Sequence, residues 1–173
     1  MTPDELKTLQ SPLKEKYRDQ PSQAMITLRA EGKLTDGISC KIQTSKAVVE
    51  AGLHPATGGD GSLACSGDML LEALAACAGV TLRAVATAIG VEIIDGTVRA
   101  EGDLDFRGTL GVSKDVPVGF RAIRLSFDLD TNAADDQLQT LQKLTERYCV
   151  VYQTLAHGVT LETSFKSGRN DQD

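Results

Sequence analysis

The sequence contains no tryptophan, and its aromatic residues together make up only 4% of 173 residues. It therefore lacks the stacking side chains that proteins use to bind single-stranded nucleic acids. Lysine and arginine number 18 against 24 aspartates and glutamates, and the net charge is -6. Binding to a phosphate backbone depends on clustered positive charge, so we expect no nucleic-acid partner.

Histidine is also scarce, occurring only as His54 and His157, and the four cysteines form no CxxC pair. No group of histidines, cysteines or carboxylates has the spacing of a metal site. The sequence has no P-loop, no GxGxxG motif after a strand and no GxSxG elbow. We therefore expect no metal, no nucleotide cofactor and no serine hydrolase chemistry.

A long uninterrupted hydrophobic run is missing too. The first 20 residues are charged, unlike a signal peptide, and the longest apolar stretch is interrupted by Glu72 and Arg83. The apolar residues between these charges are too few for a membrane span of about 20 residues. The sequence thus predicts a cytoplasmic protein without a membrane segment. Because the cytosol keeps thiols reduced, we expect the cysteines to be core residues, reactive thiols or ligands.

The residue pattern predicts one α+β domain in the order helix, three strands, long helix, two strands, two helices and one strand. Its length fits a single domain. We place an N-terminal helical extension at residues 1–23, the main domain at 24–166 and a polar tail at 167–173. The predicted helices cover 2–19, 66–89, 133–145 and 146–156, and the predicted strands cover 24–30, 38–42, 47–49, 93–105, 120–130 and 159–165.

The helix predicted over 66–89 is apolar around nearly its whole circumference, which is typical of a helix in the middle of a fold. Ser66 or Asp68 is expected to cap it, and Gly90 to end it. A loop rich in glycine precedes it at residues 52–67. A loop of this length in a compact domain is more often functional than not, but a flexible connector remains the alternative.

Two cysteines stand out by position. Cys77 lies within this apolar helix and Cys149 lies within the late helix predicted over 146–156. Free cysteine is among the most buried residue types, so both can be plain core residues. Apolar burial also raises the pKa of a thiol, which argues against reactivity unless a positive group is near.

The surroundings of both cysteines resemble two motifs of the OsmC/Ohr family, the osmotically inducible and organic hydroperoxide resistance proteins. The segment HPATGGDGSLACSGDMLLEALAACAGVT resembles the family's glycine-rich loop and first-cysteine helix. The segment RYCVVYQTLAHGV resembles its second-cysteine motif, and the two cysteines are 72 positions apart, as in the family. The resemblance covers roughly residues 24–165.

This resemblance implies an OsmC-like fold, β(3)-α-β(2)-α(2)-β, in an intertwined homodimer around central helices, with active sites at the subunit interface. It also implies a thiol peroxidase that reduces organic hydroperoxides. Cys77 would attack the peroxide and become a sulfenic acid, and Cys149 would resolve it as a disulfide. A dithiol reductant, a lipoyl-protein in some members, would complete the cycle.

The sequence departs from the family where an arginine and a glutamate assist the first cysteine. Gly67 occupies the position of the glutamate, and the adjacent Asp68 is the expected substitute. The loop before the long helix has no arginine or lysine, so Arg29, or less well Lys33, is the candidate cation. Val150 replaces the proline that usually follows the second cysteine.

Two functions therefore stand side by side. The first is a cysteine-based hydroperoxide reductase that uses Cys77, Cys149, Arg29 and Asp68. The alternative is a non-catalytic protein of the same fold that binds a small apolar or acyl ligand in the dimer cleft. The other two cysteines, Cys40 and Cys65, match neither motif, and we expect both to be dispensable, with Cys65 the more exposed.

Overall fold

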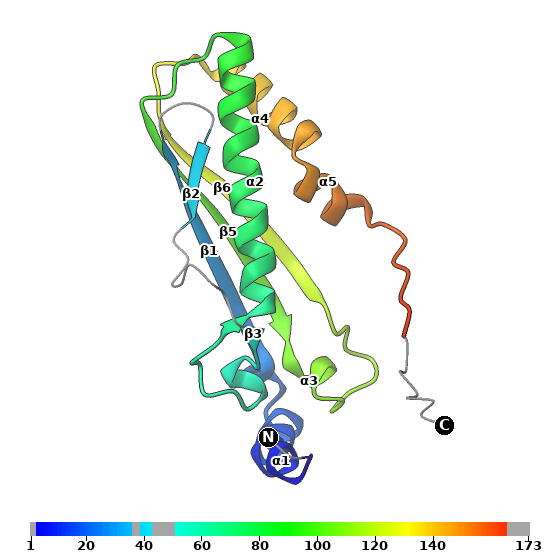
Figure 1. Ribbon diagram of the computed structural model, residues 1–173. Helices are drawn as coiled ribbons and strands as arrows, with labels where there is room; N and C mark the ends of the chain where they lie inside the picture. Colours follow the sequence, from blue (N-terminus) through cyan, green and yellow to red (C-terminus); the bar gives the residue numbers. More distant parts are fainter. Residues whose placement is uncertain (1–2, 36–38, 43–50, 166–173) are drawn as a thin grey trace, which may run out of the picture.

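The structure is a computed structural model that describes residues 3–35, 39–42 and 51–165. A long helix, α2, lies lengthwise on a four-stranded sheet, while α4 and α5 run alongside and lead to the C-terminus (Figure 1). The helical elements are α1 (Pro3–Asp19), η1 (Pro21–Ala24), η2 (Pro55–Thr57), α2 (Ser66–Ile89), α3 (Phe106–Thr109), α4 (Asp135–Tyr148) and α5 (Val150–His157). The strands are β1 (Met25–Thr35), β2 (Ser39–Ile42), β3 (Ala51–Gly52), β4 (Ala64–Cys65), β5 (Asp95–Asp105) and β6 (Phe120–Asp130). The predicted α+β class is confirmed.

The sheet has the order β2-β1-β5-β6, and every neighbouring pair is antiparallel. Residues of β5 alternate, so that Val98, Ala100 and Leu104 are buried in the core. Gly102 lies on the same face, where an added Cβ would stand 2.4 Å from the Phe120 ring and 3.3 Å from Leu71 of α2. Glycine at this position therefore leaves room for the Phe120 ring of β6 and for Leu71 of α2.

Helix α2 has the bounds that the sequence predicts, and eight of its residues are buried. Gly90 ends it in the left-handed conformation, at φ 73°, as expected. The predicted cap is wrong, because Cys65 occupies the N-cap position and Ser66 and Asp68 already lie within the first turn. The short parallel pairing of β3 with β4 brings the chain to the helix start in an extended conformation, which sets the cap one residue early.

By length and composition alone, α2 is also long and apolar enough to cross a membrane. The positions of Glu72 and Arg83 therefore do not by themselves exclude a span. In this fold the helix packs along β1, β2 and β5, and it belongs to the hydrophobic core.

Helix α1 is one continuous helix that includes Pro12, a residue type that often kinks or splits a helix. It packs on its own chain near η2 and α3. Tyr17 is buried there, and its hydroxyl donates a hydrogen bond of 2.9 Å to the carbonyl oxygen of Ala56. The proposed domain boundaries at residues 24 and 167 remain predictions.

Two predicted segments, the strand over 47–49 and the tail 167–173, lie outside the described residues. The last predicted strand, over residues 159–165, is not formed in the described structure, because this segment extends away from the sheet of its own chain (Figure 1). The segment after β5 contains the short helix α3, anchored by Arg107, which donates to both carboxylate oxygens of the buried Asp105. These hydrogen bonds hold the pKa of the Asp105 carboxyl below its usual value.

Candidate functional site

Cys77 lies on α2 where this helix packs against α5. Its neighbours Leu74 and Ala78 are buried in the core, while Cys77 itself is partly exposed. A helix of the core therefore holds the Cys77 thiol, and solvent can still contact it.

Cys149 forms the single-residue elbow between α4 and α5 and is completely buried. Its backbone N–H continues α4 by donating to the carbonyl of Thr145 at 2.9 Å. Its sulfur accepts a hydrogen bond from the backbone N–H of Tyr152 at 3.4 Å and so caps α5. One cysteine thus ends one helix and begins the next.

The sulfurs of Cys77 and Cys149 lie near each other. Burial raises the pKa of the Cys77 thiol, but hydrogen bonds to its sulfur outweigh this effect and hold the pKa below its usual value. The donors, in order of decreasing effect, are the N–H of Val151, the thiol of Cys149, the N–H of Val150 and the hydroxyl of Thr81. The first turn of α5 therefore points N–H groups at Cys77, and its helix dipole also favours a negative charge there.

The pKa of the Cys149 thiol is displaced in the opposite direction. Burial raises the pKa of its thiol to about 11, and the hydrogen bond to Cys77 and the charge on Cys77 act in the same direction. Of the two thiols, Cys77 therefore loses its proton at the lower pH, while Cys149 stays protonated at neutral pH. Such a division suits one nucleophile and one later-acting thiol.

Arg29 lies on β1, where the strand register fixes its position. It stands opposite Glu101 in the β1–β5 register. Glu101 alternates with Ala100 and Gly102, which face α2, so this register position belongs to the outer face of the sheet. Lys33 pairs with Thr97, four residues further along each strand, so its register position lies on the same outer face of the sheet.

Asp68 lies far from Cys77 along α2. It precedes Cys77 by nine residues, which is about 13 Å and two and a half turns along α2. Burial raises the pKa of the Asp68 carboxyl, and the nearby His54 partly offsets this effect. The His54 ring stacks on Phe106, at 5.0 Å between centroids, and its Nδ1 accepts from the N–H of Ala56. Asp68 thus belongs to the end of the fold that α1 covers.

The remaining sequence predictions concern the other cysteines and metals. Cys65 is half-buried and packs against the core, and the side chain of Cys40 lies outside the described residues. Among the residues that the structure describes, no group of three or more histidines, cysteines and acids is placed to hold a metal ion.

Sequence reasoning missed the uncharged donors of Cys77. The sequence prediction placed Cys149 inside a helix over 146–156, whereas α5 begins at Val150 and the N–H groups of its first turn have no acceptor within the helix. Their direction toward Cys77 depends on how α5 packs on α2, which no local pattern shows.

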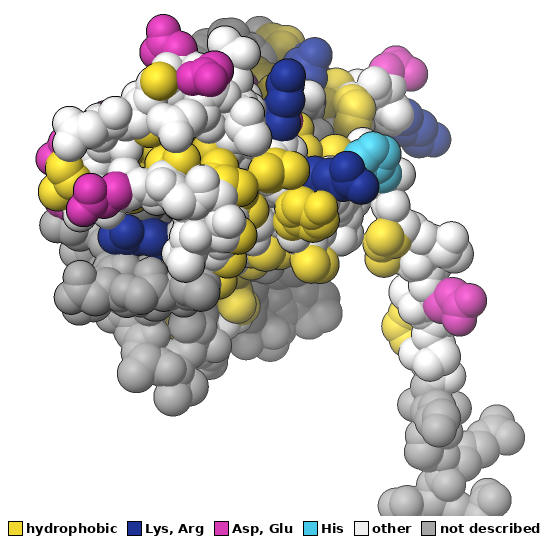
Figure 2. Space-filling model, turned by 90° about the horizontal axis from the view of Figure 1, so that it is seen from above, with side chains coloured by type: hydrophobic (Ala, Val, Ile, Leu, Met, Phe, Trp, Pro, Cys, Tyr) yellow, Lys and Arg dark blue, Asp and Glu magenta, His cyan; other side chains and the backbone are white. Residues whose placement is uncertain are grey.

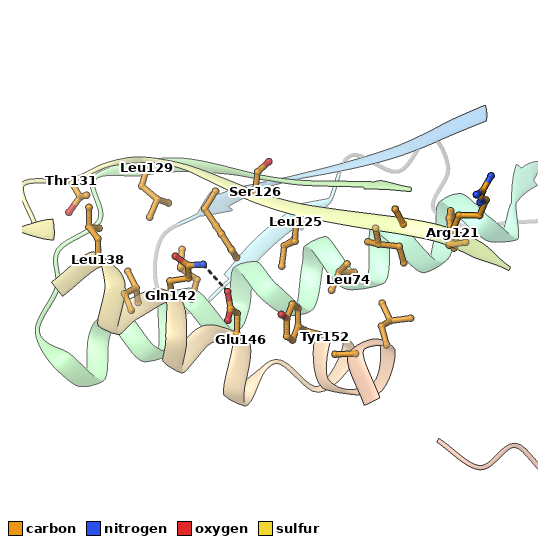
Figure 3. Close-up of a pocket in the computed structure, with 18 residues that line it drawn as sticks. Leu74, Arg121, Leu125, Ser126, Leu129, Thr131, Leu138, Gln142, Glu146 and Tyr152 are labelled. Atoms are coloured by element: carbon orange, nitrogen blue, oxygen red, sulfur yellow. Dashed lines mark hydrogen bonds between the residues drawn. The ribbon is translucent and has the colours of Figure 1, made fainter. Parts of the chain in front are cut away.

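It also missed a groove of about 870 Å³ between α2, β6, α4 and α5. Leu74, Leu125, Leu129 and Leu138 supply apolar walls, and the hydrogen-bonded pair of Gln142 and Glu146 supplies a polar patch beside Tyr152 (Figure 3). Arg121 stands at one end (Figure 3). The C-terminal arm is the segment of residues 158–165 that follows α5. Seen from above, hydrophobic side chains gather on the face beside this arm (Figure 2).

The chain matches a family model described as OsmC-like protein over residues 59–164, more than half of its length. It belongs to the OsmC-like protein family. The matched part contains α2, both strands that follow it, and the elbow with Cys149. Helix α1 and β1 lie outside it.

Solved OsmC-like structures share the fold. An OsmC-like hydroperoxide resistance protein from Jannaschia sp. CCS1 aligns with a TM-score of 0.61 and 17% identity, over 84% of this chain and 95% of that one. An OsmC-like protein from Mycoplasma pneumoniae aligns with a TM-score of 0.55 and 16% identity, over 78% and 86%. No match was found among curated protein sequences. Together with the family model, these similarities confirm the family and the fold that the two cysteine motifs indicated.

Proposed function

We propose that this OsmC-like protein is a thiol peroxidase that reduces organic hydroperoxides. The observation that carries the proposal is the hydrogen-bonded pair of Cys77 and Cys149, whose pKa values are displaced in opposite directions. A nucleophilic thiolate beside a protonated thiol is the arrangement that oxidation followed by resolution requires.

The reaction has two steps. The Cys77 thiolate attacks the outer oxygen of the hydroperoxide and the O–O bond breaks, so that Cys77 becomes a sulfenic acid and an alcohol leaves after taking a proton. Cys149 then loses its proton and attacks the sulfenic sulfur, forming a Cys77–Cys149 disulfide and releasing water. A dithiol, for example a lipoyl-protein, reduces this disulfide and is itself oxidised. This cycle suits the cytoplasm, where dithiol reductants are maintained.

The groove supports a second candidate, the binding of a small apolar or acyl ligand without catalysis. Its leucine walls are suited to hydrocarbon, and a protein that only binds would not need a reactive pair. The two functions differ in what happens to the thiols.

One experiment separates them. Reduced protein receives one equivalent of tert-butyl hydroperoxide, and mass spectrometry of its peptides follows all four thiols. We expect a Cys77–Cys149 disulfide in the wild type, a sulfenic then sulfinic acid at Cys77 in Cys149→Ser, and no turnover in Cys77→Ser. The control Cys65→Ser is expected to behave as the wild type. Four free thiols after an hour would refute the peroxidase and favour the binding protein.

We further propose a homodimer as the working form. The arm after α5 exposes Val159, Leu161 and Phe165, the last at 97%. Strand β6 is a sheet edge with an apolar groove beside it, which a second copy would cover. Because Arg29 stands at an outer-face register position and Asp68 lies about 13 Å from Cys77 along α2, any assistance from them would come from the partner subunit.

A further inference from the structure

The elbow at the buried Cys149 leads into α5, whose side chains pack on the core but are only partly buried. Helix α5 has eight residues, and none of them is buried. A helix this short is not stable by its own hydrogen bonds. The direction of the Cys149 sulfur depends on the angle between α4 and α5. Hydrogen bonds across the elbow between these two helices therefore help to fix that direction.

Gln153 makes two of these bonds. Its backbone N–H donates to the carbonyl oxygen of Cys149 at 2.9 Å. Its side-chain Nε2 donates to the carbonyl oxygen of Glu146 at 2.8 Å. That carbonyl lies in the last turn of α4, where carbonyl groups have no partner within their own helix. The side chain of Gln153 therefore ties α5 to α4 directly across Cys149.

From these contacts we infer that Gln153 is a positioning residue for the second step, and that its amide keeps Cys149 directed at Cys77. This inference rests on the proposed function. The side chain of Gln153 donates to the Glu146 carbonyl and not to a sulfur, so its loss slows disulfide closure most. The first attack on peroxide slows by less, through the α5 N–H groups that donate to Cys77. Small misplacements of a reacting group cost about 10- to 100-fold in rate.

Gln153→Met tests the inference, because methionine has the same length and good helix propensity but no N–H donor. Gln153→Lys restores a donor of similar reach. Gln139→Met, on the exposed side of α4, is the matched control. Circular dichroism checks that each variant is folded.

Two rates are measured in each protein by quenching and mass spectrometry, the oxidation of Cys77 by tert-butyl hydroperoxide and the closure of the Cys77–Cys149 disulfide. Closure is also measured with diamide, a thiol oxidant that needs no peroxidase chemistry. We expect Gln153→Met to slow closure about tenfold or more with both oxidants and to slow Cys77 oxidation by a smaller factor, while Gln153→Lys and Gln139→Met close at the wild-type rate.

Wild-type closure in Gln153→Met would overturn the positioning role, and so would a folded Gln153→Lys that is as slow as Gln153→Met. If peroxide does not react with the wild type but diamide closes the disulfide more slowly in Gln153→Met alone, the proposed function fails and the positioning role stands. If neither oxidant joins the two cysteines in the wild type, both proposals are refuted.

Discussion

At the scale of single residues, Cys77 and Cys149 differ by their surroundings. Both are partly or fully withdrawn from water, which raises the pKa of a thiol in either case. Cys77 gains enough donors to reverse that effect, while Cys149 gains too few. In the described structure these donors are uncharged, so thiolate stabilisation within one chain comes from hydrogen bonds and a helix dipole.

The hydroxyl of Thr81 offers a direct test of this view. Thr81→Val removes one donor and keeps the shape, so we expect the pKa of Cys77 to rise. A hydrogen bond to a charged group contributes about 1.5 kcal/mol or more, which corresponds to about tenfold slower alkylation of Cys77 near pH 7. Iodoacetamide labelling across pH 5–10, resolved by peptide mass spectrometry, measures the rate for each cysteine.

In the wild type Cys77 should label at lower pH than a free thiol, and Cys149 only near its pKa of about 11. Thr87→Val is the matched control, because Thr87 lies on the same helix and its hydroxyl bonds only the Arg83 carbonyl. An unchanged pH profile in Thr81→Val would contradict the role of the hydroxyl.

At the scale of elements, α1 is fastened to the loop that precedes α2. The bond from Tyr17 to the Ala56 carbonyl joins α1 to η2. His54 in the same loop stacks on Phe106 of α3. A mostly polar helix that would not be stable alone is thus held by one buried aromatic side chain and its hydroxyl.

We therefore expect Tyr17→Phe to lower the free energy of unfolding by about 1 kcal/mol, because the Ala56 carbonyl loses its partner. Urea denaturation followed by circular dichroism measures the change. Tyr148→Phe, at a tyrosine that is 57% exposed, is the control and should change stability by less than about 0.5 kcal/mol. Equal stability of Tyr17→Phe and the wild type would show that the hydroxyl does not hold α1.

At the scale of the whole molecule, the single chain leaves apolar surface without a partner. The C-terminal arm extends from the body (Figure 1), and a groove lies beside β6. The pattern of the arm, with Val159, Leu161 and Phe165 at every second or fourth position, is that of a strand. A strand needs a neighbour for its backbone hydrogen bonds, and a second copy would supply one.

Light scattering at micromolar concentration is expected to give about twice the chain mass of 18.4 kDa. Deleting residues 159–173 should shift the protein toward the monomer, because the apolar arm is removed. Deleting only residues 167–173 removes the polar tail and should leave the dimer intact. A full-length monomer would contradict the dimer, and an unaffected dimer after the longer deletion would contradict the role of the arm.

Local sequence patterns determined much of this protein. The apolar run with Gly90 at its end predicted α2 with its observed bounds, and the alternation from Phe120 to Asp130 predicted β6. The two motifs around Cys77 and Cys149 indicated the family, which the family model confirms. These features depend on period, turn chemistry and motif, all of which are read along the chain.

Only the tertiary structure decided the rest. Whether Cys77 receives hydrogen bonds from Val150 and Val151 depends on the packing of α5 against α2. That Arg29 stands at an outer-face register position follows from the pairing of β1 with β5. Residues 159–165 have the pattern of a strand, but the pattern cannot supply the neighbouring strand that a ladder requires. Contacts between segments far apart in sequence set the charge state of the thiols, and no local pattern encodes them.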